Sequence, residues 1–412
     1  LVVSLVTRKE GMSRAFVPEG PEQVEDQEAP EAKGLAHAAS RHSLGPYVLC
    51  GPALSYFTRK LHAALHWSHL PYRWLPKHAG NLAAVEARAA THQVPVLLTP
   101  ENWVVGDTTP QLHLLDGRLP HALFFPTYNR ALGVSTAVTG ALVQVAEEYL
   151  DEWLPRAAIL YRWAYADSAA HASAMLGRDA ASGMGAQAQA AAGTMIQAWG
   201  SKAMRALGLA EEEERRLMEE EFLRVFSALD AHIGRQWAAR GGRSPVFVLG
   251  GTPCAIDAVL AGSLWAHFAS DPAAAKVLRQ HCPRVIQWAD DLHRMQSGTW
   301  AWEEHAPVDT ARLDEGFLGA LLGLMGPFLV FLRENARALV AGQKAFTADV
   351  YGCGRAVSYL TRPYPELSRR QASRWIRLHL SAEERRQLEA ILARYGIADF
   401  LADDGLSPFS RL

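Results

Sequence analysis

Apolar and polar positions along residues 45–120 form short blocks that are separated by turn residues. Tyr47–Cys50 is an apolar run of strand-forming residues that stops at Gly51 and Pro52. After it, apolar residues recur at helical spacing from Phe57 until Pro71 ends the run, and residues 71–75 and 94–98 form two more strand-like runs. The pattern therefore predicts a strand, a helix and two further strands, in that order.

Ser55 stands where this helix should begin. Serine is a favoured N-cap residue, so capping alone would explain its presence. Backbone N–H groups are unpaired at a helix N-terminus and the helix dipole is positive there, so the same position also suits an anion. A thiolate beside the Ser55 hydroxyl is one such anion, and a lowered thiol pKa would make the thiol a nucleophile.

Pro95 lies near the start of the third strand-like run, where a proline needs a reason. A cis Val94–Pro95 bond could turn the chain so that the N–H and C=O of Val94 face an extended, peptide-like ligand. An edge strand that begins with proline is the alternative. The sequence by itself leaves both open.

The order of these elements resembles the thioredoxin-like domain of glutathione transferases. The likeness includes a hairpin through residues 100–102 and a helix capped by Asp107 and Thr108, where the family usually has Glu/Gln-Ser. The Ser-Tyr-Phe-Thr-Arg-Lys stretch from Ser55 to Lys60 is similar to the serine-type pattern. The resemblance implies that a thiol is supported by Ser55 and Tyr56 and that glutathione is bound by Gln93, Val94, Pro95, Asp107 and Thr108.

The resemblance continues into the C-terminal half. Residues 250–257 look like the box that opens the central buried helix of the family's helical domain, with Cys254 at the capping position and Asp257 in a structural role. Residues 148–154, 160–163 and 282–288 look like a bacterial subfamily with an enlarged C-terminal domain. The implied fold is an α/β thioredoxin-like domain followed by an all-α glutathione-transferase domain with a helical extension.

We place the domain boundaries as follows: a disordered tail over 1–44, the thioredoxin-like domain over 45–122, the helical domain over 123–305 and a mostly helical extension over 306–412. Helical spacing recurs over 141–154, with a new start at Pro155, and over 211–240, 318–339 and 369–395. Residues 345–351 alternate like a strand. Residues 167–200 could be helical or loosely ordered. The length and aromatic content of the extension suggest that it covers the mouth of the site.

Composition narrows the function classes. Lysine and arginine number 41 against 43 acidic residues, so no net field attracts nucleic acid or an anionic membrane. The four cysteines have no paired spacing, which argues against a zinc site or a disulfide framework. The longest apolar stretch, 317–332, is too short to span a bilayer and favours a buried helix pair. With no export signal evident, we expect a cytoplasmic protein.

Other residues have both a functional and a structural interpretation. His62, His66 and His69 share a helix face and could bind a metal, although a solvated surface is favoured because no carboxylate or cysteine completes the set. Cys50 reads as a buried structural thiol. The four residues that could face a second substrate, or could simply form interdomain core, are Tyr161, Arg162, Trp163 and Tyr165.

The leading hypothesis is a glutathione-transferase-like enzyme that joins the glutathione thiolate to a small hydrophobic electrophile. Glutathione would be its co-substrate, and no metal, nucleic acid or membrane is expected. The resemblance also implies a homodimer, which the extension could block. The rival is a non-catalytic module of the same fold that binds a ligand or a protein. Glutathione-dependent isomerisation, reduction or ether cleavage is a third option, although disulfide reduction would need a cysteine at position 55.

Overall fold

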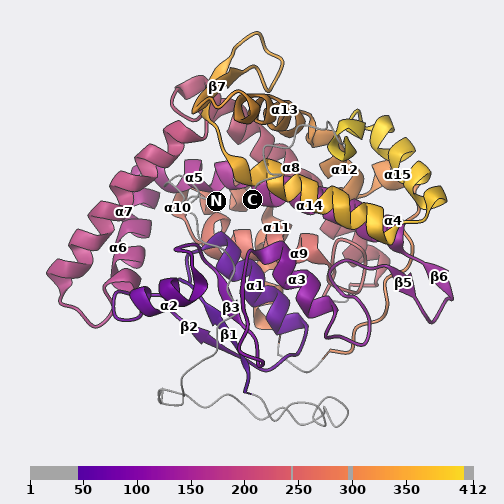
Figure 1. The fold of residues 1–412 in the computed structure, drawn as a ribbon, viewed down its shortest axis with the longest axis horizontal. Coiled ribbons are helices and arrows are strands. Elements are labelled where there is room, and N and C mark those ends of the chain that lie inside the picture. The colour runs from indigo at the N-terminus through magenta and orange to yellow at the C-terminus, as the bar shows by residue number, and fades with distance from the viewer. Residues whose placement is uncertain (1–44, 243–244, 296–299, 403–412) are drawn as a thin grey trace.

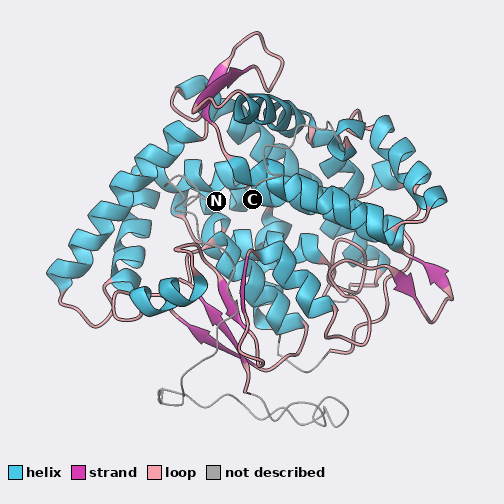
Figure 2. Cartoon of the chain, viewed as in Figure 1, coloured by secondary structure: helices cyan, strands magenta, loops and turns pink. Residues whose placement is uncertain are grey.

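The N-terminal part of the chain forms a four-stranded mixed sheet with helices beside it (Figures 1 and 2). The structure is a computed structural model that describes residues 45–242, 245–295 and 300–402, so the predicted tail over 1–44 lies outside the described residues. The strand order is β2-β1-β3-β4, in which β1 and β2 are parallel and the other two pairs are antiparallel. Its elements in chain order are β1 (Tyr47–Cys50), α1 (Tyr56–Trp67), β2 (Tyr72–Leu75), α2 (Leu82–Ala89), β3 (Val96–Leu98), β4 (Val104–Gly106) and α3 (Thr108–Asp116).

This arrangement confirms the predicted thioredoxin-like fold. The parallel β1–β2 pair requires a crossover, and α1 supplies it. Ser55 caps α1 as predicted. The Val94–Pro95 peptide bond is cis, so the first of the two alternatives for Pro95 is the one the structure has. The strand predicted over 94–98 is shorter, because ladder pairing begins at Val96.

Helix α1 packs against the sheet and also against helices of the C-terminal half. Helix α9 (Ala255–Ser263) comes so close that a Cβ on Gly262 would lie 2.4 Å from the backbone N of Lys60. Only glycine fits such an approach without a shift of backbone. Because α9 packs this closely against α1, the N-terminus of α1 has a fixed position relative to the helical region.

An all-helical region follows the sheet domain, as predicted. Residues 167–200, which the pattern left open, form two helices that run side by side at the left of Figure 1. A short β5–β6 hairpin (Tyr128–Asn129 and Val134–Ser135) precedes the region. The helices, with one π-helical turn, are α4 (Ala137–Glu152), α5 (Pro155–Trp163), α6 (Ala166–Ala180), α7 (Ala186–Ala206), α8 (Glu212–Ala239), α9, η2 (Leu264–Phe268), α10 (Pro272–His281) and α11 (Pro283–Arg294).

The C-terminal extension is mostly helical, with one β-hairpin. Its elements are η3 (Leu313–Glu315), α12 (Phe317–Leu324), α13 (Gly326–Val340), β7 (Ala345–Ala348), β8 (Val357–Leu360), α14 (Pro363–His379), α15 (Ala382–Arg394) and η4 (Ala398–Leu401). The strand expected over 345–351 ends at Ala348 and pairs with β8, which the pattern did not predict. The single helix expected over 369–395 was wrong: the chain breaks at Leu380, and Ser381 caps a new helix through a capping box with Glu384.

The extension covers α4. Helices α14 and α15 lie across it in Figure 1, and every side chain of α4 except Val138 is buried. Ser368 of α14 donates a hydrogen bond to Glu148 at 2.7 Å, and the Trp375 ring stacks on His113 of α3 with centroids 5.2 Å apart. One hydrophobic cluster runs from Tyr47 of β1 to Phe400 of η4, so the extension shares the core of the earlier parts.

The predicted buried helix pair is present as α12 and α13, bent by 42° at the Met325–Gly326 junction. Among the described helices, none is by itself long and apolar enough to cross a membrane, whereas this bent pair could by length and composition alone.

The expected solvated helix face of three histidines was wrong: His62 and His66 lie in α1 and His69 lies beyond its end, and all three are half-buried. The His62 ring lies 4.7 Å from the ring of Trp74, and the Nε2 of His66 lies 2.7 Å from the carbonyl oxygen of Met295. His69 stacks on Trp302. Burial lowers the pKa of His62 to about 3, so its ring is neutral and half-buried between aromatic side chains. Within the described residues, no group of three His, Cys, Asp or Glu side chains could hold a metal ion.

Candidate functional site

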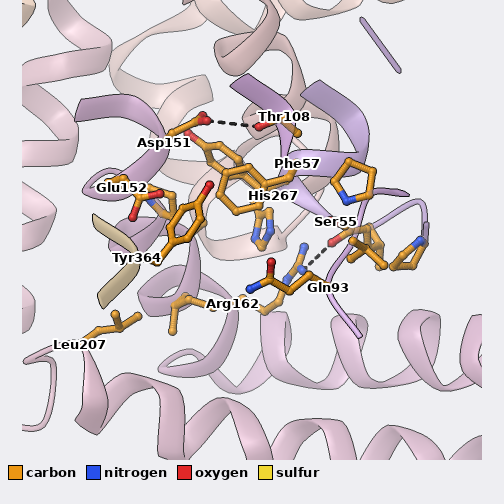
Figure 3. A pocket seen from close by; sticks show the side chains of 18 of the residues that line it. Ser55, Phe57, Gln93, Thr108, Asp151, Glu152, Arg162, Leu207, His267 and Tyr364 are labelled. Carbon is orange, nitrogen blue, oxygen red and sulfur yellow. Dashed lines mark hydrogen bonds between the residues drawn. The ribbon is translucent and has the colours of Figure 1, made fainter. Parts of the chain in front are cut away.

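A cavity of about 230 Å³ lies where the sheet domain, the helical region and the extension meet (Figure 3). All of the site residues predicted from the sequence line it: Ser55, Tyr56, Gln93, Val94, Pro95, Asp107 and Thr108. They come from separate loops and helix ends of the sheet domain, so the fold brings together positions that are up to about fifty residues apart in the chain.

Ser55 presents the N-terminus of α1 to this cavity. Its Oγ accepts a hydrogen bond from the backbone N of Thr58 at 3.3 Å, and the first turn of the helix contains no acidic residue. The unpaired backbone N–H groups and the helix dipole therefore favour a negative group at this place. The hydroxyl hydrogen of Ser55 remains able to donate to such a group while its oxygen accepts.

Tyr56 has a different role from the one proposed for Ser55. It is buried, and its hydroxyl donates to the carbonyl oxygen of Leu150 in α4 at 2.9 Å. Burial raises the pKa of this phenol well above its usual range. The tyrosine thus ties α1 to α4, and its hydroxyl proton is already donated within the protein.

The loop before β3 forms the second part of the site. Val94 and Gln93 are half-buried, and the ladder of β3 with β1 and β4 begins two residues later, at Val96. The main chain of Val94 therefore lies just beyond the sheet and at the cavity. The backbone N of Gln93 donates to the Oγ1 of Thr91 at 3.1 Å, which fixes the loop.

Asp107 and Thr108 form the third part, and both are engaged within the protein. Asp107 caps α3 through the backbone N of Thr109 at 3.4 Å, as predicted, at a φ of 67° that few non-glycine residues adopt. Its carboxylate also accepts a hydrogen bond from the Tyr364 hydroxyl of the extension. Burial raises the pKa of Asp107.

Thr108 belongs to a buried ion network that joins the sheet domain to α4. Lys60 of α1 donates to the Thr108 hydroxyl at 3.1 Å and lies 2.5 Å from both Glu147 and Asp151. The hydroxyl in turn donates to Asp151 at 3.3 Å, the dashed line at the top of Figure 3. A buried lysine between two carboxylates holds the two domains in register.

Arg162 stabilises the main chain directly before Ser55. Its guanidinium is buried, pairs with Asp271 through two hydrogen bonds of 2.9 and 3.2 Å, and donates to the carbonyl oxygen of Leu54 at 2.9 Å. His267 beside it is neutral because burial, and then the Arg162 charge, lower its pKa to about 4. Arg162 therefore fixes the turn that carries Ser55.

The remaining wall is apolar. Pro155, Ala158, Ile159, Trp163, Leu176, Ile196, Trp199 and Leu207 line the cavity from helices α5, α6 and α7 and from the end of α7. Of the aromatic residues suggested to face a second substrate, Trp163 lines the cavity, whereas Tyr161 is buried and stacks on Tyr165. The cavity thus has a polar end at Ser55 and Asp107 and an apolar end at α5–α7.

Sequence reasoning did not single out several residues that line the cavity, namely Asp151, Glu152, His267, Arg362, Tyr364 and Pro365. The run of acids in an otherwise apolar helix, residues 147–152, is a signal for the first two, because acids are rarely buried without a partner. No pattern in the neighbouring sequence indicates that Arg362 or Tyr364 lines the cavity. The expectation that the extension reaches the site is consistent with their position in the cavity.

No protein-family model matches this chain, and no curated protein matches its sequence significantly. Solved structures resemble it in fold. A glutathione S-transferase from Rhodospirillum rubrum F11 is 18% identical, with 64% of this chain and 96% of that one covered and a TM-score of 0.37. Rice GST1, solved in complex with glutathione, is 18% identical, with coverage of 67% and 96% and a TM-score of 0.36. The transferase GSTFuA3 from Phanerochaete chrysosporium is 16% identical, with coverage of 62% and 100% and a TM-score of 0.40. This chain is similar to these proteins at low identity.

Proposed function

We propose that this protein binds glutathione in the cavity and joins its thiolate to a small hydrophobic electrophile. The observation that carries the proposal is the convergence of a serine-capped helix N-terminus, the Val94 main chain and Asp107–Thr108 on one cavity with an apolar wall opposite. A polar end suits a charged peptide, and an apolar end suits an electrophile of low polarity.

Each part of the site would have a distinct task. The Ser55 hydroxyl and the α1 N-terminus stabilise the thiolate, so the thiol proton leaves to solvent at neutral pH. The main chain of Val94, beside Gln93 and Pro95, pairs with the backbone of the ligand's cysteine. The sulfur then attacks the electrophile on the apolar wall and forms a C–S bond; with an activated aryl halide, the carbon–halogen bond breaks and halide leaves to solvent with the bonding electron pair. The gain in rate comes from thiolate stabilisation and from the orientation of two reactants.

A non-catalytic binding module is the second candidate, and one observation favours it. Asp107 is engaged by Tyr364, and Thr108 is engaged by Lys60 and Asp151. A ligand that used these groups would have to compete with internal hydrogen bonds, so binding would be weaker than at an open site. Binding without turnover across varied electrophiles would support this candidate.

Isothermal titration of glutathione into the purified protein tests the proposal, followed by turnover with an activated aryl halide. We expect micromolar-to-millimolar binding, weakened by Asp107→Ala. Ser55→Ala should lower kcat/KM by about 10- to 100-fold, because a hydrogen bond to a charged group is worth roughly 1.5–3 kcal/mol. The exposed pair Ser201→Ala and Asp290→Ala are matched controls that should change neither quantity. Absence of glutathione binding by the wild type would refute the proposal.

A further inference from the structure

Two buried ionisable groups, a carboxyl and a guanidinium, line the cavity without meeting each other. Glu152 of α4 and Arg362, the residue before α14, are only 2% and 3% exposed. Within the described parts of the chain, neither the Oε2 of Glu152 nor the Nε of Arg362 makes a hydrogen bond, and the two side chains form no ion pair within 4.0 Å. Unpaired charged groups are rarely left in a protein interior, because removing them from water costs several kcal/mol each.

The fold fixes Arg362 firmly. Its backbone N donates to the Oδ1 of Asn335 at 2.8 Å, and its carbonyl accepts from the Nδ2 of the same side chain at 2.7 Å. Asn335 is itself fully buried in α13, and the Arg362 guanidinium lies 5.0 Å from the ring of Phe331. The arginine is therefore held at the cavity by its own main chain, independently of any contact to a carboxylate.

The other carboxyl groups of the cavity already have partners. Asp107 accepts from Tyr364, and Asp151 lies against Lys60 and Thr108. Among the described residues, Glu152 is therefore the acidic group of the cavity that has a buried oxygen without a hydrogen bond and no cation within 4.0 Å. A ligand with two negative groups would be disfavoured, because one of them would lie against the Glu152 carboxylate. A ligand with two positive groups would be disfavoured in the same way by the Arg362 guanidinium.

We infer that Arg362 and Glu152 together bind the two ends of an α-amino acid group, with the ligand carboxylate on the Arg362 guanidinium and the ligand ammonium on the Glu152 carboxylate. This inference rests on the proposed function and deepens it, because the γ-glutamyl end of glutathione carries both groups. A planar guanidinium suits a carboxylate, which it can bind through two parallel hydrogen bonds. The extension would then supply a specificity-determining residue to the site.

The test is a set of titrations with matched ligands. Glutathione is compared with an analogue that lacks the α-amino group, with an analogue that lacks the α-carboxylate, and with the thiol-free dipeptide γ-glutamylglycine. Each is titrated into the full chain as wild type, Arg362→Gln, Arg362→Lys and Glu152→Gln. The exposed residues of the same region supply the controls Arg374→Gln and Glu389→Gln. Thermal melts establish that each variant is folded.

In the wild type, we expect either analogue to bind about 10- to 100-fold more weakly than glutathione, as loss of a charge-assisted hydrogen bond predicts. Arg362→Gln should weaken the binding of glutathione by a similar factor. This variant should bind glutathione and the analogue without the α-carboxylate equally well. Glu152→Gln should likewise weaken the binding of glutathione, and it should bind glutathione and the analogue without the α-amino group equally well. Arg362→Lys should retain part of the discrimination, because it keeps the charge without the planar fork.

Equal binding of glutathione and both analogues by the wild type would overturn the inference, even if a variant failed to fold. Discrimination that persists in Arg362→Gln and Glu152→Gln would also overturn it. The outcomes separate it from the proposed function: Arg362-dependent binding of γ-glutamylglycine without binding of glutathione would refute the proposed function and keep this inference. Binding of neither compound would refute both.

Discussion

At the scale of single residues, the interior of this protein is organised around the acidic side chains of α4. Glu147, Glu148, Asp151 and Glu152 are all buried. Lys60 contacts Glu147 and Asp151, Ser368 donates to Glu148, and Glu152 faces the cavity. Burial raises the pKa of Asp151 to about 7 even though the Lys60 charge acts to lower it, and raises that of Glu152 to about 8. Asp151 and Glu152 are therefore close to a protonation change at neutral pH.

The pKa of Glu152 predicts how the stability of the protein depends on pH. Its folded value of about 8 lies above the ordinary value of 4.5, so the folded state binds more protons than the unfolded state between these values. Stability from this group is present below about pH 4.5 and is lost as pH rises toward about 8, at no more than about 1.4 kcal/mol per pH unit. Among the described residues, the charged or titratable groups near Glu152 include Arg362, Asp107, Asp151, Glu148 and Tyr364.

In Glu152→Gln, the free energy of unfolding should accordingly decrease less with rising pH than in the wild type. The variant should therefore become more stable relative to the wild type as pH rises. Denaturant titrations at about pH 5, 7 and 9 measure this slope. The exposed Glu389→Gln should leave it unchanged. A Glu152→Gln slope equal to that of the wild type would show that the carboxyl group is ionised in the folded protein across the whole range.

At the scale of elements, the buried helix α9 depends on an N-terminal capping box. Asp257 is fully buried and accepts hydrogen bonds from the backbone N of Cys254 and the backbone N of Val248, both at 2.8 Å. Cys254 stands at the N-cap, and its Sγ donates to the same carboxylate at 3.1 Å. The carboxylate therefore satisfies backbone donors of the helix start and of the preceding loop.

Asp257→Ala should lower the free energy of unfolding by about 2–4 kcal/mol, since it leaves buried backbone donors unpaired at roughly 1–3 kcal/mol each. Thermal melting and denaturant titration both measure the loss. Asp290→Ala on the exposed face of α11 is the control. An unchanged melting temperature in Asp257→Ala would contradict the structural role given to this residue.

At the scale of the whole molecule, the extension is part of the core rather than an addition to the surface. Helices α14 and α15 cover α4, and Arg362, Tyr364 and Pro365 complete the wall of the cavity. The side chains that these elements bury almost completely include Ile376, Leu388, Leu392 and Phe400. The same elements lie over α4, which limits how a second copy could reach that helix.

Deleting residues 363–412 should therefore unfold or aggregate the protein. Four large apolar side chains at about 1.5–3 kcal/mol each amount to roughly 6–12 kcal/mol, which is comparable to the whole stability of a typical domain. Soluble yield and thermal melting measure the effect, and deletion of 403–412, outside the described residues, is the control. A truncated chain that melted and bound glutathione like the full chain would show that the extension is dispensable.

The sequence by itself determined several local elements, including the two helix caps, Ser55 and Asp107, that line the cavity. Strand β1, the Ser55 cap, the Asp107 cap and the capping box at Asp257 all depend on residues a few positions apart, so periodicity and cap chemistry predict them. Other boundaries failed for local reasons: the break at Leu380 carries neither glycine nor proline, so helical spacing continues through it.

Only the tertiary structure decided which buried charges meet. Lys60 contacts Glu147 and Asp151, Tyr364 contacts Asp107, and Arg362 and Glu152 line the same cavity. These residues are far apart in the chain, and no local pattern encodes their approach. The physical reason is that backbone hydrogen bonds and caps form between neighbours in sequence, whereas the cost of a buried charge is met by whichever partner the packing of distant elements brings near.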